Sequence, residues 1–217
     1  FTTIPPIDEL KKESLLHYCQ KNRVRFIVPT RDGELPFWAE HQDFLISNQI
    51  GVMISSKSAI QICEDKYLFA KHLKKAPIPA IKTSLSSTSL SSEYDHFVAK
   101  ERTGTASSTI GINLRQEDLL THSQKLKRPI FQPQIKGREF SAETWIDKNN
   151  RCHGVILRWR THVIKGESHN SITFKNTAWE KKLVATFNKI EGLKGHILAQ
   201  VMVCLLYTSD AADEVDR

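Results

Sequence analysis

The sequence predicts an α/β protein in which a partial α/β layer is followed by a strand-rich α+β region. The first 55 residues alternate strand-like apolar runs with helical stretches, an order typical of parallel strands joined by crossover helices. From residue 97 onward, β-rich runs outnumber the helical stretches. Hydrophobic residues make up 40% of the 217 residues and charged residues 25%, which is the composition of a folded globular protein.

The N-terminal layer consists of two predicted helices and two predicted strands. The pattern favours an amphipathic helix over residues 8–22, a buried strand over 24–30, a helix over 35–48 and a short strand over 51–55. The chain opens on Phe1 and not on Met, so we expect this start to be internal to a longer gene product. Residues before it would then supply the rest of the layer.

The remaining elements follow in a simple order. Residues 56–76 are helical with a break near 63–65, and residues 84–93 form a Ser-rich connector. Residues 97–114 are predicted to form two strands joined by a loop of small residues. Further strands are predicted as follows: two in 129–147, one or two in 151–164, and a last one over 195–203. Helices are predicted over 116–127 and 177–192.

Composition narrows the function classes. No apolar run reaches the roughly 20 residues of a membrane helix, and no signal segment opens the chain, so we expect a cytoplasmic protein with no membrane partner. The net charge is +7, but Lys and Arg are dispersed and not gathered into a tract, which argues against a nucleic-acid partner. The four cysteines lack metal-ligand spacing, and the four tryptophans are expected to anchor cores.

Lys100 ends a predicted strand and precedes a loop of small residues that includes Gly104, Ser107 and Ser108. An ammonium group can neutralise phosphate oxygens, while backbone N–H groups and hydroxyls donate to the others. The loop matches neither a Walker A motif nor GxGxxG. A polyphosphate-binding loop and a solvated β-hairpin both fit this segment.

Two further segments carry candidate chemistry. In FQPQIKGREFS, a hinge at residues 133–135 exposes backbone groups that can pair with an adenine edge, and Glu139 follows as a possible acceptor from ribose hydroxyls. The alternative is a hairpin with a surface glutamate. In EDKYLFAKHL, Lys66 begins a helix, where a solvated lysine is the plain alternative.

Taken together in this order and spacing, Lys66, Lys100 with its loop, and QPQIKGRE resemble the ATP-grasp superfamily. The resemblance covers most of residues 56–203, which would form a truncated ATP-grasp domain. VRFIVPTRDGELPFWAE, within residues 1–55, looks like the end of a pre-ATP-grasp domain of Rossmann-like type. The pairing of VPTRDGELPFWAE with REFSAETWIDKNNRCHGVILRWR is most similar to ligases of the carbamoyl-phosphate synthase large-chain type.

The resemblance implies a role for each matching residue. Lys66 and Lys100 would contact the ATP phosphates beneath the loop of Gly104, Ser107 and Ser108, and Glu139 would hold the ribose. On the adenine side the resemblance places Gln132, Gln134 and Ile135. Gln132 stands where the family often has a glutamate, and its amide can still accept a hydrogen bond.

Arg158 and Arg160, in LRWRTHV, are candidate catalytic residues on the substrate side. A guanidinium suits a transferring phosphoryl group or a substrate carboxylate. Because the two arginines alternate with Trp159, a charged strand face with ordinary surface arginines is equally compatible with the sequence.

The metal site looks incomplete. Mg²⁺, or Mn²⁺ in its place, takes hard oxygen ligands, and the resemblance places Gln200 as one of them. The Glu-x-Asn pair expected on a following strand is absent, because the chain continues as CLLYTSDAADEVDR. Residues 204–214, CLLYTSDAADE, resemble a translated sequencing adapter, and residues 204–217 are expected to be a non-native tail.

The resemblance therefore implies an ATP-grasp ligase that activates a small-molecule carboxylate as an acyl phosphate for attack by an amine or ammonia. The fragment itself is expected to be inactive. A non-catalytic nucleotide-binding module of the same fold is one alternative, and a basic nucleic-acid-binding domain is another. The sequence names neither the substrate nor the oligomeric state.

Overall fold

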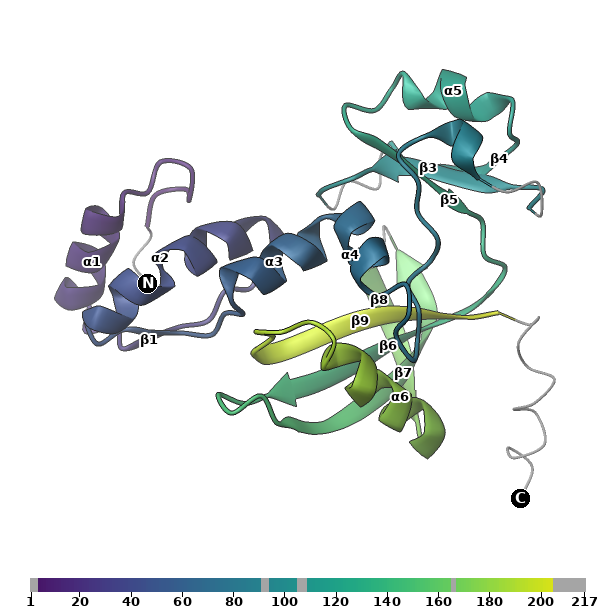
Figure 1. Cartoon of the computed structure of the whole chain (residues 1–217). Coiled ribbons are helices and arrows are strands. Elements are labelled where there is room, and N and C mark those ends of the chain that lie inside the picture. The colour runs from purple at the N-terminus through teal and green to yellow at the C-terminus, as the bar shows by residue number, and fades with distance from the viewer. Residues whose placement is uncertain (1–3, 91–93, 105–108, 165–166, 205–217) are drawn as a thin grey trace.

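The computed structural model of the chain describes residues 4–90, 94–104, 109–164 and 167–204. Within them, the strands form a two-stranded, a three-stranded and a four-stranded sheet (Figure 1). The predicted non-native tail lies outside the described residues except for Cys204, so the prediction about its origin remains a prediction.

The N-terminal unit packs helices against a parallel pair of strands. Its elements are α1 (Lys12–Lys21), β1 (Phe26–Ile27), the 3₁₀ helix η1 (Asp32–Glu34), α2 (Leu35–Ser47) and β2 (Gly51–Val52). Leu15 and Leu45 are completely buried in its core. The predicted strand–helix–strand order with parallel pairing is confirmed, but both strands are two residues long. The prediction that the first strand is buried is wrong, since Phe26 is 57% exposed. Pro29 follows β1 and has no N–H group to extend the pairing.

Two short helices lead out of this unit, α3 (Lys57–Glu64) and α4 (Lys66–His72). Asp65 separates them in an extended conformation, with φ −93° and ψ 100°, and its carboxylate caps α4. The predicted break within residues 63–65 is therefore confirmed, and its cause is the capping aspartate.

The three-stranded sheet has the order β4-β3-β5 and is antiparallel throughout. Its elements are β3 (Phe97–Glu101), β4 (Gly111–Leu114), α5 (Asp118–Ser123) and β5 (Pro129–Pro133). Phe97 and Leu119 are buried between the sheet and α5. The Ser-rich segment is more ordered than its composition predicts, because Ser84 pairs with Phe131 of β5 and the 3₁₀ helix η2 (Ser87–Ser89) follows.

The four-stranded sheet has the order β8-β7-β6-β9, again antiparallel. Its elements are β6 (Gly137–Ile146), β7 (Cys152–Ile164), β8 (Glu167–Phe174), α6 (Thr177–Phe187) and β9 (Gly195–Cys204). One face of this sheet packs against α6, which buries Phe140 and Leu157 against Leu183 and Phe187. Aromatic rings fill the same layer, with Trp159 stacked on Phe174 at a centroid distance of 4.5 Å.

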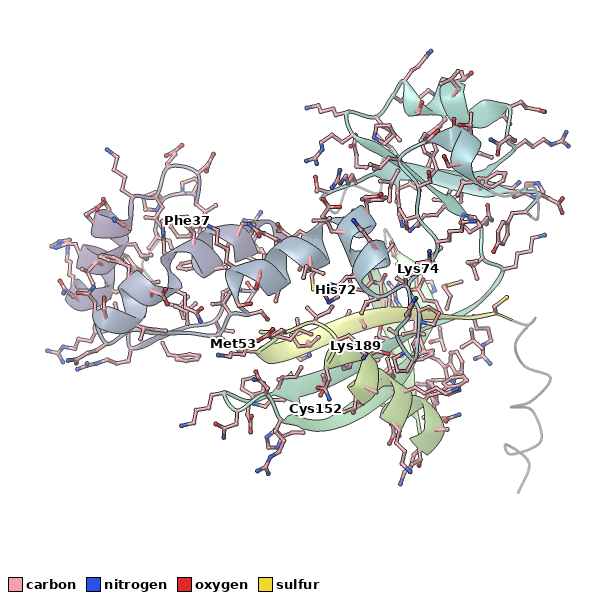
Figure 2. The ribbon with its side chains drawn as sticks, viewed as in Figure 1. Phe37, Met53, His72, Lys74, Cys152 and Lys189 are labelled. Atoms are coloured by element: carbon pink, nitrogen blue, oxygen red, sulfur yellow. The ribbon has the colours of Figure 1, made fainter. Side chains whose placement is uncertain are left out.

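Hydrogen bonds tie α3 and α4 to the connection between α6 and β9. Figure 2 labels His72 of α4 and Lys189 beyond α6, where His72 Nε2 donates to the Lys189 carbonyl at 2.6 Å. The Ser56 N–H donates to the Gly192 carbonyl at 2.8 Å. Gly192 has φ +85°, and a Cβ there would lie 2.1 Å from Ser56 Oγ, so only glycine fits this crossing.

Candidate functional site

Two lysines lie together where α4 meets β3. Lys66 is the first residue of α4, and Lys100 lies in β3 opposite Ile130 of β5. The Lys66 ammonium donates to the Gly104 carbonyl at 2.7 Å. Burial, and then the charge of Lys66, lowers the pKa of Lys100 to about 8. Because like charges in a partly desolvated site repel, a bound anion would stabilise this pair.

An ion pair between Asp65 and Arg102 holds Lys66 in place. Arg102 Nε donates to the two Asp65 oxygens at 2.8 and 2.7 Å. Burial raises the pKa of Asp65, but the Arg102 guanidinium and the N–H groups of Tyr67 and Leu68 outweigh it and hold that pKa below its ordinary value. The Lys66 N–H donates to the Arg102 carbonyl at 3.0 Å, so the start of α4 is fastened to the end of β3.

The sequence indicated Asp65 only as a helix break, and it did not point to Arg102. The available signal was an aspartate directly before a predicted helix, which is a common capping position. Its charged partner comes 37 residues later in the chain and could not be inferred from local pattern.

The loop after Lys100 is described only at its ends. Gly104 has φ +85°, a conformation that favours glycine, and its carbonyl accepts from Lys66. Ser107 and Ser108 lie outside the described residues. Their phosphate contacts remain predictions.

The end of β5 presents the three residues predicted for the adenine side. Gln132 is buried, and its amide donates to Thr83 Oγ1 at 2.8 Å. The Gln134 N–H donates to the His96 carbonyl at 2.9 Å. The backbone group of Gln134 that remains for a contact with adenine is therefore its carbonyl oxygen. Ile135 is half-buried in the connection to β6. β5 and β6 lie in different sheets, so the hairpin alternative for this segment is wrong.

The large sheet has a charged face on the side away from α6. We define the charged face by Glu139, Ser141 and Glu143 of β6, Arg158 and Arg160 of β7, and Gln200 of β9. Ser141 pairs with Arg158 on one side and Gln200 on the other, so these three side chains share one row across the sheet. As predicted, Arg158 and Arg160 lie on one face and Trp159 on the other. Trp145, on the same side of β6 as the charged face, is 47% exposed, so the prediction that all four tryptophans anchor cores is wrong at this position.

Each arginine of this face is paired with a glutamate of β6. Arg160 contacts Glu139 through Nη1, and Arg158 contacts Glu143 through Nη2. The Arg160 side chain is only 7% exposed, whereas that of Glu139 is 34% exposed and accessible to a ligand. Arg158 Nη1 also donates to Ser171 Oγ of β8 at 3.1 Å. A ribose on Glu139 would therefore have to share or displace Arg160, a competition that the sequence did not indicate.

Gln200 is exposed on the charged face and offers one neutral oxygen to a metal. The nearest carboxylates along β6, Glu139 and Glu143, are both engaged by arginines. In the part of the chain that the structure describes, no three His, Cys, Asp or Glu side chains are grouped as a metal site would require. These residues alone do not fit a complete magnesium site, and Gln200 as a ligand stays a prediction.

The candidate residues thus fall into two groups on two sheets. Lys66, Lys100 and Gly104 lie by the three-stranded sheet, and Glu139, Arg158, Arg160 and Gln200 lie on the four-stranded one. Residues 134–136 connect β5 to β6 and so join the two groups covalently (Figure 1).

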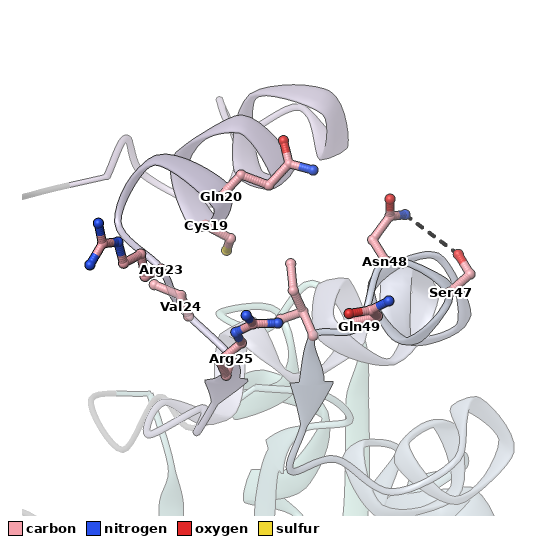
Figure 3. A pocket seen from close by; sticks show the side chains of 9 residues that line it. Cys19, Gln20, Arg23, Val24, Arg25, Ser47, Asn48 and Gln49 are labelled. Carbon is pink, nitrogen blue, oxygen red and sulfur yellow. Dashed lines mark hydrogen bonds between the residues drawn. The ribbon is translucent and has the colours of Figure 1, made fainter.

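A cavity of about 440 Å³ lies elsewhere, on the N-terminal unit (Figure 3). It is lined by the ends of α1 and α2 and by the segment that enters β1, which includes Arg23 and Arg25. Helix C-termini carry partial negative charge, and the two arginines compensate this charge at the ends of α1 and α2. The cavity shares no residue with the predicted site.

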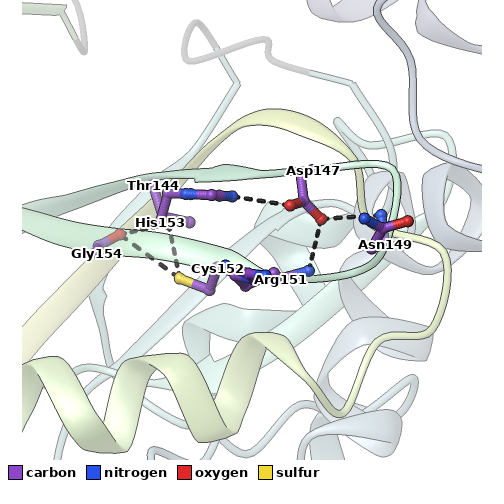
Figure 4. A network of polar contacts seen from close by, with 7 residues as sticks. All are labelled: Thr144, Asp147, Asn149, Arg151, Cys152, His153 and Gly154. Carbon is purple, nitrogen blue, oxygen red and sulfur yellow. Dashed lines mark hydrogen bonds and ion pairs between the residues drawn. The ribbon is translucent and has the colours of Figure 1, made fainter.

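A polar network closes the turn between β6 and β7 (Figure 4). Asp147 accepts from the N–H groups of Asn149 and Arg151 at 2.8 and 2.9 Å. Its hydrogen bond from His153, and then these backbone donors, lower the pKa of Asp147 to about 2. The network lies at the opposite end of β6 from Glu139. Its hydrogen bonds stabilise the turn, and this structural role explains them.

Comparison with known proteins gives one family match. Residues 63–203 match the profile of the family described as the ATP-grasp domain. A search of the curated proteins finds no match.

Solved structures resemble this chain at low sequence identity. Biotin carboxylase from Campylobacter jejuni, in a complex with β,γ-ATP, is 12% identical with a TM-score of 0.71; the match covers 89% of this chain and 49% of that one. The biotin carboxylase domain of Hydrogenobacter thermophilus 2-oxoglutarate carboxylase, with MgADP and bicarbonate, is 14% identical with a TM-score of 0.73, covering 94% and 51%. D-alanine–D-alanine ligase from Bacillus anthracis, complexed with ATP, is 16% identical with a TM-score of 0.60, covering 89% and 68%.

These identities show the fold alone. The chain spans about half the length of the two biotin carboxylase structures. None of the described helices is both long and apolar enough to span a bilayer.

Proposed function

The chain belongs to the ATP-grasp family, and from that premise we propose that it is part of an ATP-dependent ligase that joins a small-molecule carboxylate to an amine or ammonia. The predicted ATP-grasp fold is confirmed by the family match and the structural likeness. The narrower resemblance to carbamoyl-phosphate synthase large chains and the cytoplasmic location remain predictions.

The observation that carries the proposal is the lysine pair. Lys66 and Lys100 are close enough for the charge of Lys66 to depress the pKa of Lys100, and among the residues that the structure describes no acidic side chain offsets the charge of Lys100. A triphosphate supplies the negative charge that such a pair requires. The Asp65–Arg102 ion pair fixes the start of α4, where Lys66 lies, and so limits the rearrangement that binding would need.

The charged face supports the other half of the reaction. ATP supplies the phosphoryl group that turns a carboxylate into an acyl phosphate, which an amine or ammonia then attacks. Arg158 and Arg160 can orient the carboxylate and offset charge on the transferring group. Glu139 can accept a hydrogen bond from a ribose hydroxyl when its ion pair with Arg160 opens. The adenine side is bordered by Gln132, Gln134 and Ile135. Such a transfer needs positioning and charge neutralisation but no nucleophilic side chain.

Magnesium is proposed to arrive with the triphosphate, with Gln200 contributing one oxygen. The remaining ligands are not assigned to this chain, and none of the roles above depends on them.

The lysine pair gives the direct test. Lys100→Ala should weaken ATP binding by calorimetry roughly 10- to 100-fold, because a charge-assisted hydrogen bond contributes about 1.5–3 kcal/mol. Lys125→Ala, an exposed lysine near α5, is the matched control and should bind like the wild type. Equal affinities for all three proteins, with the fold intact, would remove Lys100 from the phosphate site.

Two further measurements separate the alternatives. ATP binding that is indifferent to added oligonucleotide would exclude the nucleic-acid-binding alternative. ADP release that depends on a carboxylate and an amine, in a protein that carries this chain with its natural flanking sequence, would distinguish a ligase from a silent nucleotide-binding module.

A further inference from the structure

Gln132 of β5 lies on the same face of the three-stranded sheet as Lys100. Lys100 pairs with Ile130 across β3 and β5, and Val98 pairs with Gln132 one row further along. Directly opposite residues of an antiparallel pair share a face, and so do alternate residues of one strand. Phe131 points instead into the core against α5. The row of Gln132 therefore lies roughly 7 Å from the row of Lys100 on one face.

Thr83 lies directly opposite Gln132, at the edge of β5 away from β3. The bridge between Ser84 and Phe131 has an N–H···O bond in each direction, both at 2.9 Å. Because this bridge is antiparallel, the residue before Ser84 stands beside the residue after Phe131. The side chains agree with this register, since Gln132 Nε2 donates to Thr83 Oγ1 at 2.8 Å.

The hydroxyl of Thr83 determines which end of the Gln132 amide faces it. Thr83 Oγ1 donates its own hydrogen to the Ile81 carbonyl at 2.9 Å, and a carbonyl can only accept. Toward Gln132 the hydroxyl oxygen is therefore an acceptor, and the amide group that it can receive is the NH₂. The reversed amide would set two acceptors against each other or cost the hydrogen bond to Ile81. Gln132 is consequently held with its oxygen turned away from Thr83.

The amide oxygen of Gln132 remains open to a ligand. Gln132 as a whole is 7% exposed. Among the residues that the structure describes, no donor contacts its Oε1. In the same part of the chain, the side-chain polar atoms that are buried without a partner are Trp38 Nε1 and Arg158 Nε, and Oε1 of Gln132 is not among them. This oxygen is therefore an accessible acceptor on the face that bears Lys100.

We propose that Thr83 is a positioning residue of the nucleotide site, which acts through Gln132 on the choice of base. A glutamate presents an oxygen in either orientation, but an amide has two different ends and needs a neighbour to orient it. With Thr83 in place, Gln132 offers an acceptor that matches the 6-amino group of adenine and opposes the 6-oxo group of hypoxanthine or guanine. A site of this kind rejects the wrong ligand because a buried polar group is then left unpaired. The inference rests on the proposed function and deepens it, since it names the residue that sets base selectivity at the same site.

The test compares ATP with inosine triphosphate (ITP), whose base carries a 6-oxo group, by calorimetry on the 217-residue chain. The wild type should bind ATP more tightly than ITP. Thr83→Val keeps the shape of the side chain but removes the acceptor, so the amide is free to turn its NH₂ group toward a 6-oxo base. The ratio of the ATP affinity to the ITP affinity should then fall about tenfold, mostly through tighter binding of ITP.

Gln132→Glu supplies the decisive comparison. A carboxylate has no donor to turn toward the base, so in the Gln132→Glu protein Thr83→Val should leave the affinity ratio unchanged. Thr83→Ser keeps the hydroxyl and should keep the wild-type ratio. Thr83→Ala should lower the ratio as Thr83→Val does, and it replaces the valine variant if valine disturbs the fold. Thr88→Val is the matched control, because the Thr88 hydroxyl bonds to Ser86 Oγ within the Ser-rich segment.

The outcomes separate the role of Thr83 from the nucleotide site itself. A wild-type affinity ratio in both Thr83→Val and Thr83→Ala would overturn that role. An equal fall in Thr83→Ser would assign the effect to packing, and an equal fall in the Gln132→Glu protein would show that the amide is not involved; either result also overturns it. Equal binding of ATP and ITP by the wild type would refute only the base selectivity. Absence of ATP binding in every protein would refute the proposed function, and the role of Thr83 with it.

Discussion

The pKa of Lys100 lies within the range of ordinary buffers, so the pH of the buffer changes the protonated fraction of this lysine. Its pKa of about 8 lies well below the usual value of about 10.4 because burial and Lys66 disfavour the charged form. The ammonium form is the one that attracts phosphate. Below its pKa the lysine is charged and competent to bind, and as pH rises through that pKa it loses the proton and the attraction with it.

We therefore expect ATP affinity to fall between about pH 7 and pH 9 in the wild type. Lys100→Arg should flatten this profile, because a guanidinium stays protonated throughout the range. Isothermal titration across that interval measures both. A wild-type profile as flat as that of the arginine variant would mean that Lys100 is not the titrating group at the nucleotide site.

Glu139 allows the sugar end to be separated from the phosphate end. Glu139→Gln should weaken ATP more than it weakens inorganic tripolyphosphate, since its proposed partner is the ribose. The substitution also removes the partner of the buried Arg160, so thermal unfolding must be recorded alongside. Equal losses for both ligands would place Glu139 outside the sugar site.

Residue types in the candidate site could be predicted, but their present partners could not. Lys66, Lys100, Glu139 and Gln200 were identified from local motifs and a resemblance. The ion pairs of Glu139 with Arg160 and of Asp65 with Arg102 join residues 21 and 37 positions apart, and local pattern contains no information on such distances.

Elements whose pattern was strong were predicted well. The break between α3 and α4 lies within residues 63–65, where it was predicted, and the long strands β6, β7 and β9 correspond to ranges that were predicted as strands. β8 was not predicted, because its sequence ESHNSITF is mostly polar and it forms by pairing with β7. Strand formation of that kind depends on a neighbour and not on intrinsic preference.

The start of α4 is the element on which the lysine pair depends. Asp65→Ala removes a helix cap and the partner of Arg102, and we expect a loss of roughly 2 kcal/mol in unfolding free energy. Asp65→Ser retains a capping oxygen without the charge and should recover the capping part of the loss. Urea denaturation of the three proteins measures both effects.

Calorimetry with ATP extends this experiment to function. If the ion pair positions Lys66, both Asp65 variants should bind ATP more weakly than the wild type, even where Asp65→Ser is nearly as stable. Wild-type affinity in the serine variant would assign Asp65 to stability alone.

At the scale of the whole molecule, the candidate site depends on two sheets that a three-residue connection joins. The sequence predicted the strands of both sheets in their order along the chain, but which strands share a sheet depends on pairing between distant segments. The separation of β5 from β6 is the clearest case, since their closeness in sequence equally favoured a hairpin.

The arrangement predicts a distinct pattern of amide protection by ligands. ATP should slow hydrogen exchange both around Lys66 and along residues 134–139, because phosphates contact the lysine pair while the nucleoside contacts the connection and Glu139. Tripolyphosphate has no nucleoside, so it should protect only the segments around Lys66 and Lys100. Hydrogen–deuterium exchange with mass spectrometry resolves both regions in one experiment. The Lys125→Ala protein should reproduce the wild-type pattern, and Lys100→Ala should lose both effects at subsaturating ATP. Protection by ATP confined to the three-stranded sheet would show that the nucleotide does not reach the charged face, and the roles proposed there for Glu139, Arg158 and Arg160 would fall together.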